Sequence, residues 1–391
     1  MKTFYAPLSE LAGIEQLKKD FEVTGQPVMI SGCIDTQKIH LVHAAVNDYR
    51  FRLIITGDEA KAREMQEDSR FFDKSSIYYP AKDFIFYSAD VHGNQLSGER
   101  LRCIQKIIAA QDNKTNITVI TTIDGCVDML MPLQRYRDNI IHFKNSDIID
   151  TEKLISKLVG IGYTRVPMID GQGQFAVRGG ILDVYPLTEE LPVRIELWGD
   201  EVDSIRTFDP ETQRSIEKLD EVEVFPATEF PEEEEKRVSF LDYFEKENTI
   251  LFLDEPVRLK EKGEGVEEEF LEAQKRRAQS GYEVADSEAV LFTTQEIMRK
   301  MNEYSGVGFQ ALDMRCPGLN IRASYNLQTK NVDPYNRSFE LLTQDLKKMK
   351  RNQSRVILLS GSRTRARRLA EDLRDYNLSS FYSEDADREV Q

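Results

Sequence analysis

Residues 174–214 read QFAVRGGILDVYPLTEELPVRIELWGDEVDSIRTFDPETQR, and this stretch decides the fold of the middle of the chain. Short apolar runs alternate with turn signals such as Gly199-Asp200, a pattern typical of consecutive antiparallel β-strands. Within VRIELW, residues 193–198, strict alternation places the three aliphatic side chains on one face of the strand. The other face then carries Arg194, Glu196 and Trp198, the only tryptophan of the chain.

The outer face of this expected sheet is the first candidate functional surface. Arg178 lies on the opposite side of its strand from Phe175 and Val177, and we group it with Arg194 and Trp198. Trp and Arg are enriched at the energetic centres of protein interfaces, so the pattern favours a partner-binding patch. The alternative is a solvated sheet face on which Trp198 packs against a neighbouring domain.

Length and composition are those of a multidomain globular protein. The chain has 391 residues, of which 40% are hydrophobic and 31% are charged, and a chain of this length is expected to form about two to four domains. It has no apolar run of the roughly 20 residues needed to span a bilayer, and its N-terminus lacks the apolar core of a signal peptide. We therefore predict a cytoplasmic protein that does not enter a membrane.

Cysteine, histidine and charge content exclude some kinds of site. The four cysteines are far apart without a CxxC pair, and there are only four histidines, so we predict reduced thiols and no bound metal. The net charge of −16 disfavours a large non-specific nucleic-acid footprint, although it leaves room for a local basic patch. The acidic runs at 232–235 and 264–269 are interpreted as solvated faces.

Strand and helix signals predict an α/β domain with an insertion. A doubly wound parallel sheet is indicated by a helix at 98–108 and by strands at 28–30, 52–55, 76–79 and 117–120. A small α+β insertion follows, with a helix at 151–159 and a strand-rich block that runs to Pro226. The α/β character then returns with a long helix at 266–279 and strands at 250–253, 289–292 and 319–321.

The predicted domain boundaries follow from these signals: an α/β domain in two parts, 1–139 and 227–323, an insertion at 140–226, a linker at 324–339 and a partial α/β domain at 340–391. The last part has helices at 341–350 and 363–375 and strands at 356–359 and 381–382. An unfinished βαβ unit cannot bury both faces of a parallel sheet, so we expect the chain to belong to a longer protein. The arginine-rich helix at 363–375 is interpreted as a solvated face, with nucleic-acid contact as the alternative.

The turn after the first strand resembles a phosphate-binding loop with two defects. A P-loop, G-x-x-x-x-G-K-[ST], needs glycines for backbone approach to phosphate, a lysine for the terminal phosphates and a hydroxyl for magnesium. Gly32 and Lys38 stand at the required spacing, but Gln37 replaces the second glycine and Ile39 replaces the hydroxyl residue. We interpret the loop as an ordinary strand-to-helix turn that does not hydrolyse ATP.

An apolar strand that ends in Asp254-Glu255 is the second candidate for nucleotide chemistry. Nucleoside triphosphatases place a magnesium-binding Asp and a water-activating Glu in this way. Acidic residues also often end strands or cap helices. Because the pair lacks a working P-loop and so has no nucleotide to act on, we predict no catalysis here.

The chain resembles a known family at these residues. The runs VRGGILDVYP, PVRIELWGDEVDSIRTFDPETQR and VFPATEF closely resemble the N-terminal region of bacterial transcription-repair coupling factors, which is itself similar to the excision-repair subunit UvrB. The resemblance covers nearly the whole chain, is most specific from Arg178 to Phe230, and is weaker from Met1 to Ile141 and in the final portion. It implies a degenerate RecA/UvrB-like parallel-sheet domain, interrupted by a small α+β domain that binds the repair protein UvrA and followed by the start of a further α/β domain.

Site residues are carried over from the family by motif position. The family's UvrA contact uses two arginines and an aromatic residue, which correspond here to Arg178, Arg194 and Trp198. The aromatic is more often Phe, so Trp198 departs from the family pattern. The resemblance also implies that the nucleotide loop has lost ATP binding, and it makes Asp254-Glu255 a relic of the motor's acidic box. The long DNA-clamping hairpin of UvrB would follow Tyr79, where the sequence leaves little room for it.

The function implied by the resemblance is that of a non-catalytic adaptor, which recruits UvrA to RNA polymerase stalled at a DNA lesion. RNA polymerase and DNA would be bound by other domains of the full-length protein. ATP and magnesium would be bound only by its motor, so no cofactor is expected on this chain. The rival hypothesis is an active UvrB-like, ATP-dependent DNA enzyme, which requires nucleotide binding at Lys38. A third hypothesis is that the patch docks another domain of the same protein.

Overall fold

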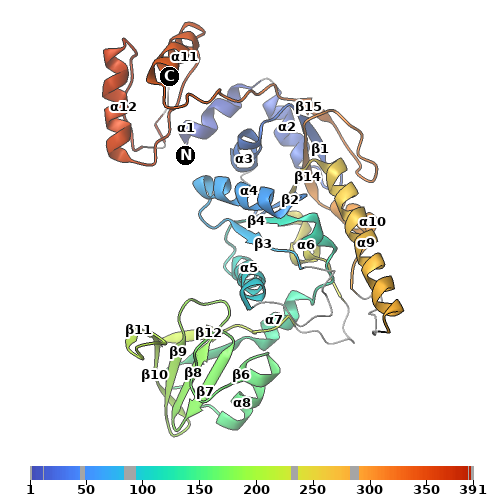
Figure 1. Ribbon diagram of the computed structural model, residues 1–391, viewed down its shortest axis with the longest axis vertical. Helices are drawn as coiled ribbons and strands as arrows, with labels where there is room; N and C mark the ends of the chain where they lie inside the picture. The colour runs from blue at the N-terminus through green and yellow to red at the C-terminus, as the bar shows by residue number, and fades with distance from the viewer. Residues whose placement is uncertain are drawn as a thin grey trace.

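The computed structural model describes residues 2–11, 13–44, 49–82, 94–229, 237–281, 290–385 and 387–388. These residues form an α/β domain, a second domain inserted into it, and a pair of C-terminal helices at the opposite end of the molecule from the insertion (Figure 1). The expected fold class, a parallel-sheet α/β domain with a separate antiparallel-sheet insertion, is confirmed.

The α/β domain is built on a seven-stranded parallel sheet with the strand order β15-β1-β14-β13-β2-β4-β3. The strands are β1 (Val28–Ser31), β2 (Phe51–Thr56), β3 (Ile77–Tyr79), β4 (Ile117–Thr122), β13 (Thr249–Asp254), β14 (Ser305–Gln310) and β15 (Ser324–Asn326). Every residue of the first six is buried. This burial is expected for a parallel sheet whose two faces are both covered by helices.

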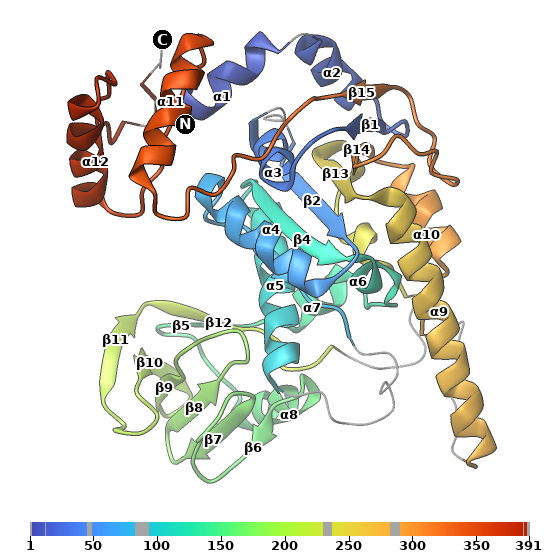
Figure 2. The ribbon, with the colours of Figure 1, turned by 45° about the horizontal axis from the view of Figure 1, so that its top comes forward.

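Alternate strand residues enter two hydrophobic cores, one on each face of the sheet. Leu53 and Ile55 belong to one core and Ile54 to the other. The core around Ile54 is covered by α1 (Lys2–Tyr5), η1 (Ala6–Glu10), α2 (Ile14–Phe21), α3 (Asp35–Ala44) and α4 (Glu59–Phe72). The opposite face is covered by α5 (Asn94–Asp112), α6 (Ile123–Val127), α9 (Pro256–Gln279), α10 (Thr294–Met301) and the short helix η2 (Phe240–Tyr243), as Figure 2 shows for the longer helices. The short helix η3 (Lys246–Asn248) precedes β13 and has no buried residue.

Strand β14 was not among the predicted strands, and its glycines explain the omission. Its sequence, SGVGFQ, lacks a continuous apolar run. A Cβ at Gly308 would lie 2.4 Å from Met29 Sδ, so the glycine permits the close packing of Met29 from the neighbouring strand. The strand predicted at 319–321 is wrong, since these residues form a loop. Of the strand predicted at 289–292, the described residues make only an isolated bridge between Leu291 and Asp128, and residue 289 lies outside the described chain.

Two further boundaries differ from expectation. The predicted linker at 324–339 begins with β15, which pairs in parallel with β1 at the edge of the sheet. The long helix predicted at 266–279 begins earlier, at Pro256. The acidic run at 232–235 falls outside the described residues, and so do residues 83–93 of the segment after Tyr79 where a DNA-clamping hairpin would lie.

The inserted domain has one sheet and one main helix. Its six-stranded sheet has the order β11-β10-β9-β8-β7-β6, with β6 (Thr164–Arg165), β7 (Gln174–Arg178), β8 (Ile181–Tyr185), β9 (Val193–Trp198), β10 (Glu201–Phe208) and β11 (Ser215–Leu219). All of its pairings are antiparallel except the one between β6 and β7. Helix α8 (Thr151–Gly160) packs Leu154 and Leu158 into the core on the inner face. The chain passes between the domains through α7 (Leu133–Asn139) and an antiparallel ribbon of β5 (Ile141–Lys144) and β12 (Glu221–Val224).

The C-terminal part consists of two helices, α11 (Phe339–Arg351) and α12 (Arg363–Asp375), joined around a small core of Leu346, Leu373 and Leu378. The strands predicted at 356–359 and 381–382 are wrong, because among the described residues both segments have no strand pairing. The apolar run Val356–Leu359 is more than one-third exposed throughout, so local β-propensity without a pairing partner does not make a strand. Across the described chain, no helix has both the length and the apolar character needed to cross a bilayer.

A buried ionic network links α5 of the α/β domain to the segment through which the chain leaves the inserted domain. Arg100 of α5 is fully buried and donates hydrogen bonds to Asp128 (2.6 Å), to Glu229 (2.7 Å) and to the Pro80 carbonyl (2.7 Å). Lys82 adds an ion pair of 2.8 Å to Glu229. Burial favours protonation of Glu229, but the attraction of Arg100 and Lys82 outweighs burial and lowers the pKa of its carboxyl.

This network predicts a large cost for removing its central cation. Arg100→Leu leaves the buried Asp128 carboxylate and the largely buried Glu229 carboxylate without the arginine that joins them, so we expect the free energy of unfolding to fall by about 3–5 kcal/mol. The control is Arg70→Leu, since Arg70 pairs with Glu67 on an exposed helix surface and such pairs contribute less than about 1 kcal/mol. Urea denaturation followed by circular dichroism measures both variants. Equal shifts in the two would contradict the role of the network.

Candidate functional site: the outer face of the inserted sheet

Strand register arranges the outer face of the inserted sheet in rows that run across β7 to β10. One row contains Arg178, Ile181, Glu196 and Ser204. The next contains Ala176, Asp183, Arg194 and Arg206. Side chains that are directly opposite on antiparallel strands share a face, so Arg178, Arg194 and Trp198 all lie on the outer face. The expected separation of faces is thus present, with Phe175, Val193 and Ile195 buried on the inner side.

A single buried carboxylate joins the two predicted arginines. Asp183 is 1% exposed and accepts hydrogen bonds from Arg178 Nη2 (2.7 Å), Arg194 Nε (2.6 Å) and Arg194 Nη2 (2.9 Å). Arg194 also donates to Gln213 (2.7 Å) and its guanidinium lies 4.1 Å from the centre of the Phe208 ring. The side chain of Arg194 is therefore only 11% exposed, whereas that of Arg178 is 43% exposed.

A second ion pair lies beside the first on the same face. Arg206 donates to both oxygens of Glu196, at 2.7 and 2.5 Å, and the Ser204 hydroxyl donates to the same carboxylate at 2.8 Å. These hydrogen bonds lower the pKa of Glu196 to about 2, so its carboxylate is charged at neutral pH. Together with Arg178, Arg194 and Asp183, these two neighbouring ion-pair clusters contain three cations and two anions.

Trp198 differs from its neighbours because it packs against little of its own domain. It is the most exposed large hydrophobic residue of the described chain, at 84%. It pairs with Glu201 across the Gly199-Asp200 turn, and the Gly179-Gly180 turn that follows Arg178 lies at the same end of the sheet. Two tight hairpins thus fix the backbone on both sides of an exposed indole ring. An aromatic side chain held in this way is suited to burial in a partner's pocket.

The degenerate nucleotide loop is filled by the chain itself. Leu327 N donates to the Ser31 carbonyl (2.9 Å), and the Thr329 hydroxyl donates to the Gly32 carbonyl (2.9 Å). The same hydroxyl accepts from Ile34 N (2.9 Å), one of the backbone groups that a phosphate would use in a working loop. Gly32 has φ of +78°, and a Cβ there would lie 2.6 Å from the Leu327 carbonyl oxygen. The absence of a Cβ at Gly32 therefore allows the backbone of residues 327–329 to pack closely against the loop.

The Lys38 ammonium group forms ion pairs with carboxylates of the same chain. Its ammonium lies 2.7 Å from Asp254, 3.2 Å from Asp35 and 3.8 Å from Glu255, and its side chain is 7% exposed. Burial alone would lower the pKa of Lys38, but the attraction and hydrogen bonds of Asp254 and Asp35 outweigh burial and raise it. Thr56 donates to the second oxygen of Asp254 at 3.1 Å. The structure brings Lys38 together with Asp254-Glu255, as in a nucleotide site, but the ammonium group is already paired with the Asp254 carboxylate.

The side chains of Gln37 and Ile39 have other roles in this region. Gln37 Nε2 lies 3.1 Å from His40 Nδ1, and Ile39 is buried in the core beneath α3. Within the described residues, no cluster of three or more His, Cys, Asp or Glu side chains is arranged to hold a metal ion.

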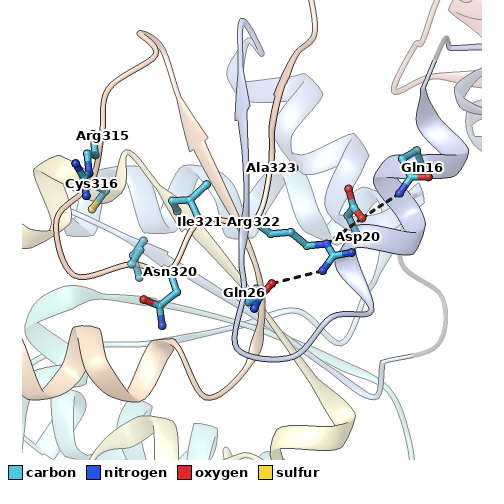
Figure 3. A pocket seen from close by; sticks show the side chains of 10 residues that line it. Gln16, Asp20, Gln26, Arg315, Cys316, Asn320, Ile321, Arg322 and Ala323 are labelled. Carbon is cyan, nitrogen blue, oxygen red and sulfur yellow. Dashed lines mark hydrogen bonds and ion pairs between the residues drawn. The ribbon is translucent and has the colours of Figure 1, made fainter.

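A polar groove lies elsewhere on the α/β domain, between α2 and residues 315–323, with a volume of about 860 Å³ (Figure 3). Asp20 accepts hydrogen bonds within it from Arg322 (3.1 Å), Gln16 (3.1 Å) and Tyr325 (2.5 Å). These bonds attach residues 322–325 to α2, so the groove's carboxylate is used by the fold. On α12, Arg363 and Arg367 both pair with Glu384 at 3.4 Å, which fits the interpretation of that helix as a solvated face.

Asp183 and Thr329 are the residues that sequence reasoning missed. Asp183 sits in an apolar strand, ILDVY, and its alternation places it on the same face as Arg178; a carboxylate within such a strand was a usable signal. Thr329 gave no signal, since it reaches Gly32 from nearly 300 residues away along the chain.

Comparison with known proteins finds a described family that the inserted domain matches. Residues 141–230 match the family described as the UvrB interaction domain. The transcription-repair-coupling factor of Bacillus subtilis is 26% identical over 389 residues, which cover 84% of this chain and 32% of that protein. Those of Staphylococcus haemolyticus and Staphylococcus epidermidis are each 33% identical, over 52% and 54% of this chain and 17% and 18% of theirs. The resemblance to transcription-repair coupling factors is thus confirmed, and the chain spans less than a third of the length of these relatives.

The position of Asp183 predicts a local loss of stability in a charge-neutral variant. Asp183→Asn removes a buried anion and turns an NH₂ donor toward two arginines, so we expect the opening free energy of β8 and β9 to fall by about 1.5–3 kcal/mol. The control is Glu223→Gln, because Glu223 pairs with His142 where both side chains are more than half exposed; its effect should stay below about 1 kcal/mol. Amide hydrogen exchange of the β8–β9 peptides measures the change. Unaltered exchange in Asp183→Asn would show that the carboxylate does not hold the face together.

Proposed function

We propose that this chain is a non-catalytic docking module of a transcription-repair coupling factor, and that it recruits UvrA through the outer face of its inserted domain. The observation that carries the proposal is Trp198, an indole ring that is 84% exposed between two hairpin turns, within the residues that match the UvrB interaction domain. Burial of an exposed aromatic side chain against a partner is a strong source of binding free energy.

The three predicted contact residues have different tasks in this mechanism. Trp198 buries its ring in a pocket of UvrA. Arg178 makes one hydrogen bond to Asp183 and its side chain is 43% exposed, so its guanidinium can also pair with a carboxylate of UvrA. Arg194 is nearly buried and bonded to Asp183 and Gln213, so it acts mainly as a positioning residue that fixes the charge and shape of the face.

The remaining activities are assigned to other parts of the full-length protein. We propose that RNA polymerase and DNA bind there, and that ATP and magnesium bind only to its motor, because here Lys38 is neutralised and Thr329 occupies the loop. The protein would act in the bacterial cytoplasm, where stalled RNA polymerase and damaged DNA are found. In this assignment, the inserted domain connects a stalled polymerase to the excision-repair machinery.

Binding to purified UvrA tests the proposal directly. Trp198→Ala should weaken affinity by about 30-fold or more, the scale of an interface hot spot, and Arg178→Ala by about fivefold. Arg194→Ala should also weaken binding through disorder of the face. The matched control is Arg165→Ala, an exposed arginine on β6 at the far edge of the same sheet, which should bind as the parent chain does.

Two results would contradict this assignment. If the parent chain does not bind UvrA, the recruitment function is wrong, and the outer face is then better explained as a docking surface for another domain of the same protein. If UvrA binds equally well to Trp198→Ala and Arg194→Ala, the module binds UvrA by a different surface. Circular dichroism of Trp198→Ala, Arg178→Ala and Arg165→Ala must match that of the parent chain.

Isothermal titration with ATP and magnesium separates this proposal from an active UvrB-like, ATP-dependent DNA enzyme. We expect no binding to the parent chain, since a phosphate would have to displace the Thr329 hydroxyl and Lys38 would have to leave Asp254. The variant Thr329→Ala, which removes the internal hydroxyl, serves as the comparison. ATP affinity of the parent chain that is abolished by Lys38→Ala would establish a working nucleotide site and contradict the proposal.

A further inference from the structure

We propose that Ile148 forms, together with Trp198, the apolar ridge that enters UvrA, so that the docking surface extends beyond the sheet to the chain that enters the inserted domain. This inference rests on the proposed function and identifies a contact residue that neither the sequence motif nor the family resemblance indicates. Its partner is a continuous apolar groove on UvrA that is long enough for two side chains.

Strand pairing places the two side chains in one row. Trp198 pairs with Glu201, and Glu201 forms an antiparallel bridge with Ile148. The flanking hydrogen bonds run from Ile149 N to the Asp200 carbonyl (2.7 Å) and from Val202 N to the Asp147 carbonyl (2.9 Å). This pattern makes Ile148 and Glu201 a non-hydrogen-bonded pair, in which side chains lie close together on one face. The row beside Arg178 therefore reads Trp198, Glu201, Ile148.

Both ends of the row are unusually exposed for apolar residues. Ile148 is 75% exposed and Trp198 is 84% exposed, the two highest values among the large hydrophobic residues of the described chain. An isolated exposed apolar residue is ordinary, but here two lie in one row, on the two segments that flank β10. The methylene groups of the Glu201 side chain lie between them, and its carboxylate can remain in water.

The backbone around Ile148 is held rigidly, so its exposure is a fixed feature of the fold. Asp147 N donates to the Lys144 carbonyl (3.1 Å), and the Asp147 carboxylate accepts from Lys144 N (2.8 Å). Ser146 N donates to the Val202 carbonyl (2.9 Å) while Ser146 adopts a left-handed φ of +72°. Non-glycine residues rarely adopt this conformation. The segment is thus tied on one side to β5 and on the other to β10, which removes much of the entropy cost of ordering Ile148 on binding.

Charge around the ridge adds to its complementarity. Arg178 lies in the adjacent row, while Asp200, Glu201 and Asp203 are exposed at the hairpin end. A surface that fits this arrangement has an apolar groove, a carboxylate near Arg178 and a basic group near the acidic corner. Such a pattern orients the partner as well as attracting it.

Titration of the full chain with UvrA tests the ridge. We expect Ile148→Ala to weaken binding roughly five- to tenfold, because it exposes part of the groove on UvrA that Ile148 would fill. The control is Val159→Ala, since Val159 is an exposed aliphatic residue of the same domain on α8, which packs on the inner face of the sheet. Val159→Ala should bind with unchanged affinity. Hydrogen exchange of residues 144–149 and 198–204 in free Ile148→Ala should match that of the parent chain.

A double-mutant cycle gives a second readout. If one groove takes both side chains, the losses in Ile148→Ala and Trp198→Ala should not add, and the double variant should bind several-fold more tightly than the product of the two losses predicts. Parent-level affinity of Ile148→Ala, in a chain whose binding is weakened by Trp198→Ala, would overturn the ridge and leave the proposed function standing. A parent chain that does not bind UvrA would overturn both.

Discussion

The bonds between Asp183 and the two arginines are the constraint on which the outer face of the inserted domain depends. Three strands meet there, and each contributes one charged side chain to the cluster. The carboxylate of β8 is buried because Arg178 of β7 and Arg194 of β9 both donate to it, which fixes three adjacent strands in one register. Beyond this polar centre, Trp198 lies at the end of a short hairpin and Ile148 on the segment bridged to β10, and both remain exposed. The arrangement combines a rigid charged platform with an apolar edge, as protein-binding surfaces often do.

In the α/β domain, by contrast, the residues of the candidate nucleotide site bond to one another. It keeps the strand, turn and helix of a nucleotide-binding domain, and its sheet still brings Lys38 to Asp254. Yet Lys38 is paired with Asp254, and residues 327–329, which follow the edge strand β15, hydrogen-bond to the loop. Internal groups contact the backbone that a phosphate would use in a working loop, so function has to be inferred from the site and not from the fold. In our account, the domain serves as a scaffold that carries the inserted domain.

Local patterns in the sequence were sufficient to predict the faces of the inserted sheet and most strands of the parallel sheet. Period-two alternation in VRIELW separates buried from exposed residues directly, and buried runs such as FRLIIT indicate covered strands. Strand β14 was not predicted because Gly306 and Gly308 interrupt its apolar pattern. The partnership of Thr329 with Gly32 and the row of Trp198, Glu201 and Ile148 depend on register between distant segments. No local pattern encodes that register, so these features required the three-dimensional structure.

The central claim is that the inserted face binds a partner while the nucleotide loop binds no ligand, and hydrogen exchange mass spectrometry of the parent chain tests both halves at once. With saturating UvrA, we predict protection confined to residues 146–149, 178–183 and 194–202. With ATP and magnesium, residues 31–39 and 327–329 should exchange as they do in the free chain. Protection of the nucleotide loop by ATP, or unchanged exchange of the inserted face in the presence of UvrA, would contradict the account.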